Sequence, residues 1–370
     1  MSVLDSIRKN LRDLGFSAEF TTQPELWSWL RRTPLTYTIP PLKVNESLKR
    51  WTTPVGTTYT DFQQGMKGNY GTIMLALRET FALEDGEYCF LKMSDTHNKT
   101  LLIEGILQTL AHSVLSAAGF PKAVPKVLDI CSHPKVGTVL VLQRIHGSQV
   151  LAEYLSTHIQ WGCPSDTNDR LLMSILAQVA SYSAILEKEL GMNHRDLKGT
   201  NVLMVVPSKE QIQFQTTLDS YHWGITSNHQ TILIDFGFSC IGRPSGDTVV
   251  SAGEFLPETD FCPKEGRDLF LFLASLWNLE HLRNSLTLKA KELFQGWLRD
   301  NTQGTCWSDW LMNTGSTEAD SLVSMYLLTS SNGFASSNCS PFNILKKIAS
   351  AYPEVCQFTT LRRPGTPVPS

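Results

Sequence analysis

The stretch that decides the fold is residues 194–203, with the sequence HRDLKGTNVL, and further along the chain residues 232–237 read ILIDFG. The first stretch is a polar turn between apolar neighbours. It offers the carboxylate of Asp196, an ammonium group two residues later and an amide five residues later. The second is a β-branched strand that ends in the carboxylate of Asp235. One carboxylate that accepts a proton, with an amide and a second carboxylate that bind a divalent metal, is what phosphoryl transfer from a nucleotide requires.

Both stretches resemble motifs of one protein family. The first resembles the catalytic loop H-R-D-L-x-x-x-N of eukaryotic-type protein kinases, and Asp235-Phe236-Gly237 resembles their D-F-G motif. The resemblance implies an α+β, bilobal protein-kinase-like fold. Its small N-terminal lobe would hold an antiparallel sheet plus one helix, and its larger C-terminal lobe would be mostly helical. Residues 186–190, LEKEL, are similar to haspin-type kinases and kinases of large DNA viruses, so we expect a divergent member.

The resemblance implies a Ser/Thr protein kinase, which transfers the γ-phosphate of Mg-ATP to hydroxyl groups of proteins. Asp196 would be the catalytic base, and Lys198 would neutralise charge on the migrating phosphoryl group. In the family, a lysine at this place accompanies Ser/Thr specificity. Asn201 and Asp235 would bind Mg²⁺, which prefers oxygen ligands. ATP and Mg²⁺ are therefore the expected cofactors, and a protein substrate with Ser or Thr is the expected partner.

Upstream of these motifs, residues 59–77 are predicted to form a strand, a glycine loop and a second strand. Glycine lets the backbone approach phosphate groups closely, although a plain hairpin turn explains such a loop equally well. Kinases have G-x-G-x-x-G in this place. Gly68 and Gly71 match the second and third glycines, whereas Met66 stands at the first. The resemblance places the nucleotide against Gly68, Gly71 and Ile73.

The next apolar strand, residues 88–93, contains a single lysine, Lys92. Because burying an unpartnered ammonium is costly, this lysine must lie at an edge or meet an anion. The resemblance makes Lys92 a catalytic residue that binds the nucleotide phosphates and pairs with Glu104, the only acidic residue of a helix predicted over 98–118. The alternative for Glu104 is a solvated position on the outer helix face. Phe90 stands where kinases have a small Ala, so its ring either narrows the adenine pocket or stacks on the base.

Apolar periodicity predicts the remaining secondary structure. Further strands are expected at 125–130 and 137–142, an extended surface hairpin within 207–230, and helices at 148–158, 168–190, 267–277, 286–300, 305–313, 318–330 and 341–351. By resemblance, the residues after the second strand form the hinge between lobes, where Gln143 and Ile145 would bind the adenine edge. Asp268, at the start of an apolar helix, either caps that helix or holds the backbone of the catalytic loop, as it does in kinases.

The stretch from Asp235 to Glu258 corresponds to the activation segment of the family, although Leu256 stands where the closing A-P-E motif has alanine. It contains four hydroxyl side chains, Ser239, Ser245, Thr248 and Ser251. Arg195 could pair with a phosphate on one of them, since guanidinium and phosphate form strong bidentate contacts. The alternative is a segment that is ordered without modification.

The chain divides into four parts by these patterns. We expect a helical N-terminal segment at 1–50, a kinase N-lobe at 51–143, a kinase C-lobe at 144–360 and a disordered, Pro-rich tail at 361–370. The N-terminal segment either docks on the following domain or binds a partner.

Composition excludes several functions. The net charge of −3 does not favour nucleic-acid binding. The eight cysteines have no C-x-x-C spacing, which argues against a zinc site and against a disulfide framework, so we expect reduced thiols. Neither a secretory signal nor a membrane-spanning apolar run is recognisable, and we expect a cytoplasmic or nuclear protein with no membrane partner. The oligomeric state is left open.

Two other functions fit the same residues. Met66, Phe90 and the short spacing between Lys92 and Glu104 would suit a pseudokinase that serves as a scaffold. The intact Asp196, Asn201 and Asp235 argue against that hypothesis, because a non-catalytic protein has no chemical need for all three. A small-molecule kinase of related fold is the third hypothesis.

Overall fold

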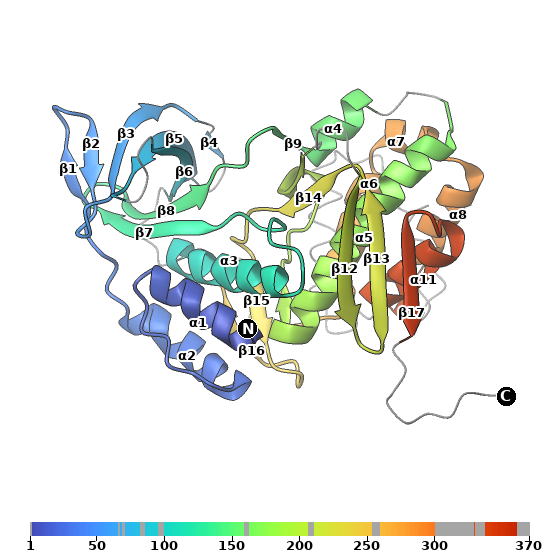
Figure 1. The fold of residues 1–370 in the computed structure, drawn as a ribbon, viewed down its shortest axis with the longest axis horizontal. Helices are drawn as coiled ribbons and strands as arrows, with labels where there is room; N and C mark the ends of the chain where they lie inside the picture. Colours follow the sequence, from blue (N-terminus) through green and yellow to red (C-terminus); the bar gives the residue numbers. More distant parts are fainter. Residues whose placement is uncertain are drawn as a thin grey trace.

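In the computed structural model, the chain forms an α+β fold with a curled antiparallel sheet and several helices (Figure 1). The described strands of the large sheet all lie within residues 43–143, and six of the nine described α-helices lie after residue 150, in what we call the helical half. The structure describes residues 2–65, 67–68, 71–81, 86–94, 100–158, 163–205, 211–253, 260–299, 329 and 337–360. The predicted helix at 305–313, almost all of that at 318–330, and the tail at 361–370 lie outside these residues.

The large sheet has eight antiparallel strands within the described part of the chain, in the order β1-β2-β3-β5-β6-β8-β7, with β4 paired to β5. These strands are β1 (Lys43–Asn45), β2 (Arg50–Thr52), β3 (Thr58–Gln63), β4 (Lys67–Gly68), β5 (Gly71–Glu79), β6 (Glu87–Met93), β7 (Val127–His133) and β8 (Gly137–Gln143). The strands predicted from periodicity are confirmed. The sheet also includes β1, which begins before the boundary expected at residue 51.

Helix α3 (Thr100–Ala117) packs against β7 and β8 and confirms the helix predicted over 98–118. Gly105 permits this contact, because a Cβ atom there would lie 2.7 Å from Cδ1 of Ile130 and 2.8 Å from Cδ1 of Leu140. By length and hydropathy α3 could also cross a membrane, but 72% of it is buried inside the protein. Such burial is typical of the core helix of a folded domain.

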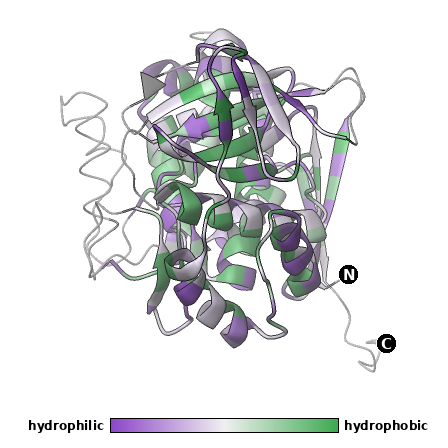
Figure 2. Ribbon diagram, turned by 90° about the vertical axis from the view of Figure 1, so that its left-hand side faces the viewer, coloured by the Kyte–Doolittle hydropathy of each residue, from purple (hydrophilic) through white to green (hydrophobic). Residues whose placement is uncertain are grey.

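Two hydrophobic clusters cover the two faces of the large sheet. The outer face carries Tyr59, Cys89 and Leu91, and the partly buried rings of Trp51 and Phe62 pack against them. The inner face belongs to the main core, which continues through α3 into the helical half. Figure 2 shows hydrophobic residues along these strands and along the helices below them. The alternation of a strand places Phe90 and Lys92 on the inner face, opposite to Leu91.

The N-terminal segment forms α1 (Val3–Asp13) and α2 (Gln23–Thr36). Both helices begin with a capping box, formed by Ser2 and Asp5 in α1 and by Thr22 and Glu25 in α2. Their apolar side chains join the main core, so the segment docks on the rest of the chain. Of the two alternatives left open by the sequence, docking is the one that the structure shows.

The helical half contains the elements that carry the two deciding motifs. They are β9 (Ser148–Val150), α4 (Leu151–His158), α5 (Asp166–Leu190), β10 (Met192–Asn193), η1 (Gly199–Asn201), β11 (Val202–Val205), β14 (Gln230–Leu233), β15 (Cys240–Gly242), β16 (Thr248–Ser251), α6 (Arg267–Trp277), α7 (Glu280–Asn284), α8 (Leu288–Trp297), η2 (Ser337–Cys339) and α11 (Pro341–Ala351). The helix predicted at 148–158 is wrong in its first three residues, because they pair with β11 instead. A long-range strand partner there overrides the local helical pattern.

A second sheet lies beside α5 and combines β12 (Ile212–Leu218), β13 (Tyr221–Ser227) and β17 (Cys356–Thr360). The predicted hairpin is confirmed, and one face of β12 is exposed while the other face packs inward. Trp223 is fully buried, with its ring 4.8 Å from that of Phe358 and 5.6 Å from that of Phe342. The sequence did not indicate β17, because its partner strand lies far away along the chain.

Candidate active site

Lys92 on β6 lies between two carboxylates that come from distant parts of the chain. Its Nζ atom donates to Oε1 of Glu104 on α3 and to Oδ1 of Asp235, at 2.7 Å in both cases. Glu104 is only 2% exposed, so the solvated position considered for it is wrong. The pairing of Lys92 with Glu104, expected from the resemblance, is present despite the short spacing.

Charge complementarity favours the ionised forms of Lys92 and Asp235. Burial alone would lower the pKa of Lys92, but the neighbouring Glu104 and Asp235 outweigh it and raise the pKa. Burial would raise the pKa of Asp235, but Lys92 outweighs it and holds the pKa below its usual value. Burial of Glu104 dominates over the nearby ammonium and raises its pKa. At neutral pH, Lys92 is therefore a cation beside an ionised Asp235.

Asp196 lies in the turn after β10, where two neighbours of its own loop hold its carboxylate. The Nζ atom of Lys198 lies 2.9 Å from Oδ1 of Asp196. The amide Nδ2 of Asn201 donates to Oδ2 and to the backbone oxygen of Asp196, at 2.8 Å each. Both bonds use the amide nitrogen of Asn201, so its side-chain oxygen Oδ1 remains for another ligand. Burial raises the pKa of Asp196, and Lys198 opposes that rise.

Backbone contacts join the two motifs. Strands β11 and β14 pair antiparallel, with Val202 opposite Leu233. The backbone N–H of Ile234 donates to the backbone oxygen of Asn201 at 3.0 Å. The ring nitrogen Nε2 of His194 lies 3.0 Å from the oxygen of Ile234. These contacts bring Asp235 next to residues 194–203, the loop that resembles the catalytic loop of kinases, where its charge contributes to the raised pKa of Asp196. The two candidate metal ligands, Asn201 and Asp235, therefore lie next to the backbone hydrogen bond that joins the two motifs.

Asp268 fixes the start of the catalytic loop. Its Oδ2 and Oδ1 atoms accept hydrogen bonds from the backbone N–H groups of His194 at 2.7 Å and of Arg195 at 2.8 Å. The N-cap of α6 is Gly266, so Asp268 is not the cap. Of the two roles considered for Asp268, the structure therefore shows the bond to the catalytic loop.

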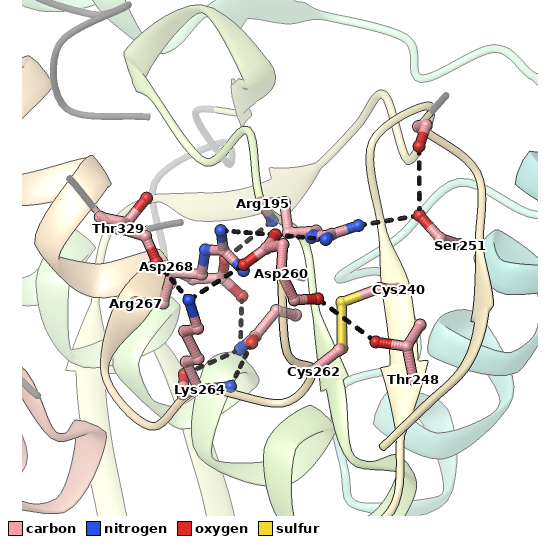
Figure 3. A network of polar contacts seen from close by, with 12 residues as sticks. Arg195, Cys240, Thr248, Ser251, Asp260, Cys262, Lys264, Arg267, Asp268 and Thr329 are labelled. Atoms are coloured by element: carbon pink, nitrogen blue, oxygen red, sulfur yellow. Dashed lines mark hydrogen bonds and ion pairs between the residues drawn. A yellow bond between two sulfur atoms is a disulfide. The ribbon is translucent and has the colours of Figure 1, made fainter. Parts of the chain in front are cut away.

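Arg195 forms an ion pair with Asp260 of the same chain, as Figure 3 shows. Its Nη2 donates to Asp260, and its Nη1 donates to Oγ of Ser251 on β16 at 2.8 Å. Asp260 also accepts from Arg267 at 2.8 Å and lies 3.0 Å from Nζ of Lys264. The side chain of Asp260 is fully buried. Burial alone would raise its pKa, but the surrounding cations outweigh burial and lower the pKa below its usual value. The contact expected for a phosphate at Arg195 is thus occupied by Asp260.

A disulfide joins Cys240 on β15 to Cys262, beside this network (Figure 3). The expectation that all the cysteines are reduced is therefore wrong for this pair. The two residues are 22 positions apart, and only the folding of the segment brings their Cα atoms to 6.3 Å. Their spacing carries no motif, so the sequence could not indicate the bond. Burial raises the pKa of three other cysteines, Cys89, Cys131 and Cys356, to about 12.

The expected nucleotide-binding residues of the N-terminal half lie along β4, β5 and the end of β8. Gly68 pairs with Gly71, and a Cβ atom at Gly71 would lie 2.0 Å from the oxygen of Met93, so only glycine fits there. Ile73 lies opposite Lys92 in the sheet. Met66 lies outside the described residues. Phe90 is 36% exposed on the same face as Lys92 and lies opposite Leu75 and Leu142.

The two expected hinge residues lie at and after the end of β8. The backbone N–H of Gln143 donates to the oxygen of Lys126 at 2.9 Å, so that group is already used within the sheet. Ile145 follows in the connection to β9, and its backbone oxygen accepts from Oγ of Ser148 at 2.9 Å. The structure thus places both residues between the large sheet and the helical half.

The residues fit Mg²⁺ only in combination with other ligands. Among the described residues, no group of three or more His, Cys, Asp or Glu side chains could hold a metal ion. Asn201 and Asp235 offer two oxygen ligands, and Mg²⁺ is commonly held by one or two carboxylates together with substrate phosphates and water. The site thus suits a metal that arrives with a nucleotide.

The structure brings together most of the candidate residues, and it adds Asp260 and the disulfide, for which the sequence carried no signal. Asp268 was recognisable only through the resemblance. In comparisons with known proteins, the chain matches no protein-family model and no curated protein.

Proposed function

We propose that this protein is a Ser/Thr protein kinase with the bilobal kinase fold, a divergent member of the eukaryotic-type family. One observation carries the proposal. Lys92 is held at 2.7 Å from both Glu104 and Asp235, although the three residues come from a strand, a helix and a loop, and Asp235 lies 143 positions after Lys92. A buried cation shared by two carboxylates is costly to assemble, and phosphate binding gives it a purpose.

Each residue then has a task in phosphoryl transfer. Bound Mg-ATP supplies the γ-phosphoryl group, and the oxygens of Asn201 and Asp235 would hold the metal. The ammonium of Lys92 offsets the negative charge of the phosphates. Asp196 orients the attacking hydroxyl and accepts its proton, and its raised pKa makes it a better base than an ordinary aspartate. Lys198, beside Asp196, offsets charge that develops on the transferred group.

The scaffold hypothesis retains two supporting observations. Met66, outside the described residues, stands in place of a glycine, and the ring of Phe90 is 36% exposed on the face that carries Lys92. The spacing of Lys92 and Glu104 no longer supports it, since that pair forms. No contact of the described residues favours a small-molecule kinase over a protein kinase. We propose a cytoplasmic or nuclear location. Disulfides are rare in proteins of these compartments, so the Cys240–Cys262 bond would be unusual there.

The test is transfer of labelled phosphate by the full-length chain. The protein is incubated with Mg-[γ-³²P]ATP and a broad panel of Ser- and Thr-containing proteins, beside the Asp196→Ala and Lys92→Met variants. Glu153→Gln, on the exposed side of α4, is the matched control. We expect label on Ser and Thr with the wild type and with the control, and a loss of at least 100-fold in both site variants.

Three outcomes would contradict the proposal in different ways. Incorporation no higher than in Asp196→Ala would exclude transfer. Thermal stabilisation by Mg-ATP without transfer would favour the scaffold, because a ligand that binds the folded state raises its stability. Labelling of small alcohols but not of proteins would favour the small-molecule kinase.

A further inference from the structure

The two N-terminal helices contact two elements that carry or bind residues of the candidate active site. Figure 1 shows α1 directly alongside α3, with α2 below it and beside β16. The contacts agree, since α1 packs on α3 and α2 packs on β16. Helix α3 carries Glu104, and β16 carries Ser251, which binds Arg195 of the catalytic loop. Residues 3–36 therefore connect the helix that holds Lys92 with the segment that follows Asp235.

The contact between α1 and α3 is both apolar and specific. Ile7 and Leu11 are fully buried in the core that α3 shares. Two hydrogen bonds converge on Ser113 of α3. Oγ of Ser6 donates to its backbone oxygen at 3.2 Å, and Nδ2 of Asn10 donates to its Oγ at 2.7 Å. These polar bonds set the register between the helices, which apolar packing alone leaves free to slide.

This contact fixes Glu104 from a distance. Ser113 lies on the same continuous helix, so holding its position and rotation also holds Glu104 in front of Lys92. Gly105 lets α3 pack closely on Ile130 and Leu140. Moving the helix away from the sheet would therefore lose this apolar contact. A rigid helix gripped near both ends presents Glu104 in one orientation.

Helix α2 grips the other side. The ring of Trp27 lies 5.9 Å from the guanidinium carbon of Arg243, at the start of the loop between β15 and β16. Nε2 of Gln23 donates to the backbone oxygen of Glu189 at 3.1 Å, near the end of α5. These contacts tie α2 to the loop that leads to Ser251 and to the helix that leads to the catalytic loop.

We propose that residues 3–36 form a positioning element, a bracket in cis that holds Glu104 and β16 in their assembled arrangement. This inference rests on the proposed function and adds its regulation. The site is assembled by the chain's own N-terminal helices, without a separate activating subunit and without a phosphate at Arg195, whose partner is Asp260. Asn10 and Trp27 act through other residues and touch no reacting group.

The test uses the double variant Asn10→Ala/Trp27→Ala in the full-length chain. Ile7 and Leu11, the buried core residues of α1, stay in place, while Trp27→Ala removes a partly buried ring that packs against the main core. The matched control is Lys9→Ala/Arg31→Ala, which removes two exposed side chains from the same helices. Transfer kinetics and amide hydrogen exchange are measured on each protein, and circular dichroism checks that each is folded.

We expect the double variant to lose at least fivefold in kcat with little change in KM for the protein substrate. We also expect faster exchange at residues 100–105 of α3 and at β16, neither of which contains a mutated residue. A role limited to general stability would speed up exchange over the whole chain instead. The control should match the wild type in both measurements.

Hydrogen exchange keeps the two proposals separable, because it needs no catalysis. Unchanged exchange around Glu104 and unchanged kcat in the double variant would overturn the bracket while leaving the kinase intact. Faster local exchange in the double variant, together with no phosphate transfer by the wild type, would support the bracket as a structural coupling and overturn the proposed function. Restoring activity with Asn10→Gln in place of Asn10→Ala would add support, since the longer amide can still reach Ser113.

Discussion

Oδ1 of Asp268 lies 2.8 Å from the backbone nitrogen of Arg195, which is 73 positions earlier in the chain. The φ angle of Arg195 is +67°, in the left-handed region that residues other than glycine rarely adopt. The bond to Asp268 helps to hold the backbone in this conformation. Asp235 has the same conformation, with φ of +66°. Both strained residues flank the candidate metal site, and strain of this kind persists only where the surroundings enforce it.

Replacing Asp268 with Asn should loosen the catalytic loop. An amide has one oxygen where the carboxylate has two, so its NH2 group would face one of the N–H donors of His194 or Arg195. We expect a loss of about 2–3 kcal/mol in the free energy of unfolding, as for a charge-assisted hydrogen bond. Urea unfolding measures the loss, and the neighbouring, exposed Glu265→Gln is the control. Equal stability of the two variants would show that Asp268 does not hold the loop.

Asp260→Asn tests whether the chain's own carboxylate replaces a phosphate at Arg195. The change removes the negative charge, and one of the two oxygens, that face two buried guanidinium groups, those of Arg195 and Arg267. Breaking a buried ion pair from one side costs about 3–5 kcal/mol. We expect a loss of this size in urea unfolding, together with a loss of phosphate transfer.

Asp247→Asn, exposed in the same segment, is the control for Asp260→Asn. Phosphatase treatment of the wild type should leave its transfer rate unchanged. A phosphatase-sensitive rate would contradict the inference and would point to a modified hydroxyl near Arg195, such as Ser251.

The disulfide between Cys240 and Cys262 should stabilise the segment after Asp235. Closing a loop of 22 residues in the unfolded chain corresponds to about 3 kcal/mol in the chain-entropy model. We expect the Cys240→Ser/Cys262→Ser variant to unfold at lower urea concentration by that amount, and dithiothreitol to act on the wild type alone. Cys163→Ser, at an exposed free thiol, is the control. An unchanged wild-type midpoint in dithiothreitol would mean that the bond contributes nothing.

The sequence anticipated the local elements better than the long-range ones. Periodicity indicated α3, α5 and α6, because each has an apolar face of helical spacing. It missed β17 and mistook β9 for helix, since each strand exists only through a partner elsewhere in the chain. The same limit applies to the site. The motif residues could be read from their order, whereas Asp260 and the disulfide depend on how a single loop folds back.

Glu187 on α5 gives the protein a pH-dependent stability. Its Oε1 accepts from the backbone N–H of Gly266 at 3.2 Å and lies 3.4 Å from Nδ2 of Asn193, close to Asp268. Burial, reinforced by Asp268, raises its pKa well above the usual 4.5. The folded protein then keeps a proton that the unfolded chain releases, so stability falls as pH rises from 4.5 toward the folded pKa.

Glu187→Gln should remove that fall, because the amide is neutral at every pH. We expect the free energy of unfolding of the variant to decline less than that of the wild type as the pH rises above 4.5. Urea unfolding at several pH values provides the comparison, with the exposed Glu19→Gln as control. Parallel curves for wild type and Glu187→Gln would show that Glu187 is ionised in the folded protein throughout.

Phe90 decides how the inner face of the large sheet would meet a base. Its ring is 36% exposed in a central strand, two residues from Lys92 and on the same face. An aromatic ring in that place can stack on a nucleotide base, a contact that contributes about 1–3 kcal/mol. If it stacks, Phe90→Ala should weaken Mg-ATP binding roughly 5- to 150-fold while leaving kcat near that of the wild type. Calorimetric titration of Mg-ATP measures this change, with Phe81→Ala, at a ring 97% exposed, as control. Tighter binding by Phe90→Ala would instead mean that the ring obstructs the base, and the scaffold hypothesis would then gain its strongest support.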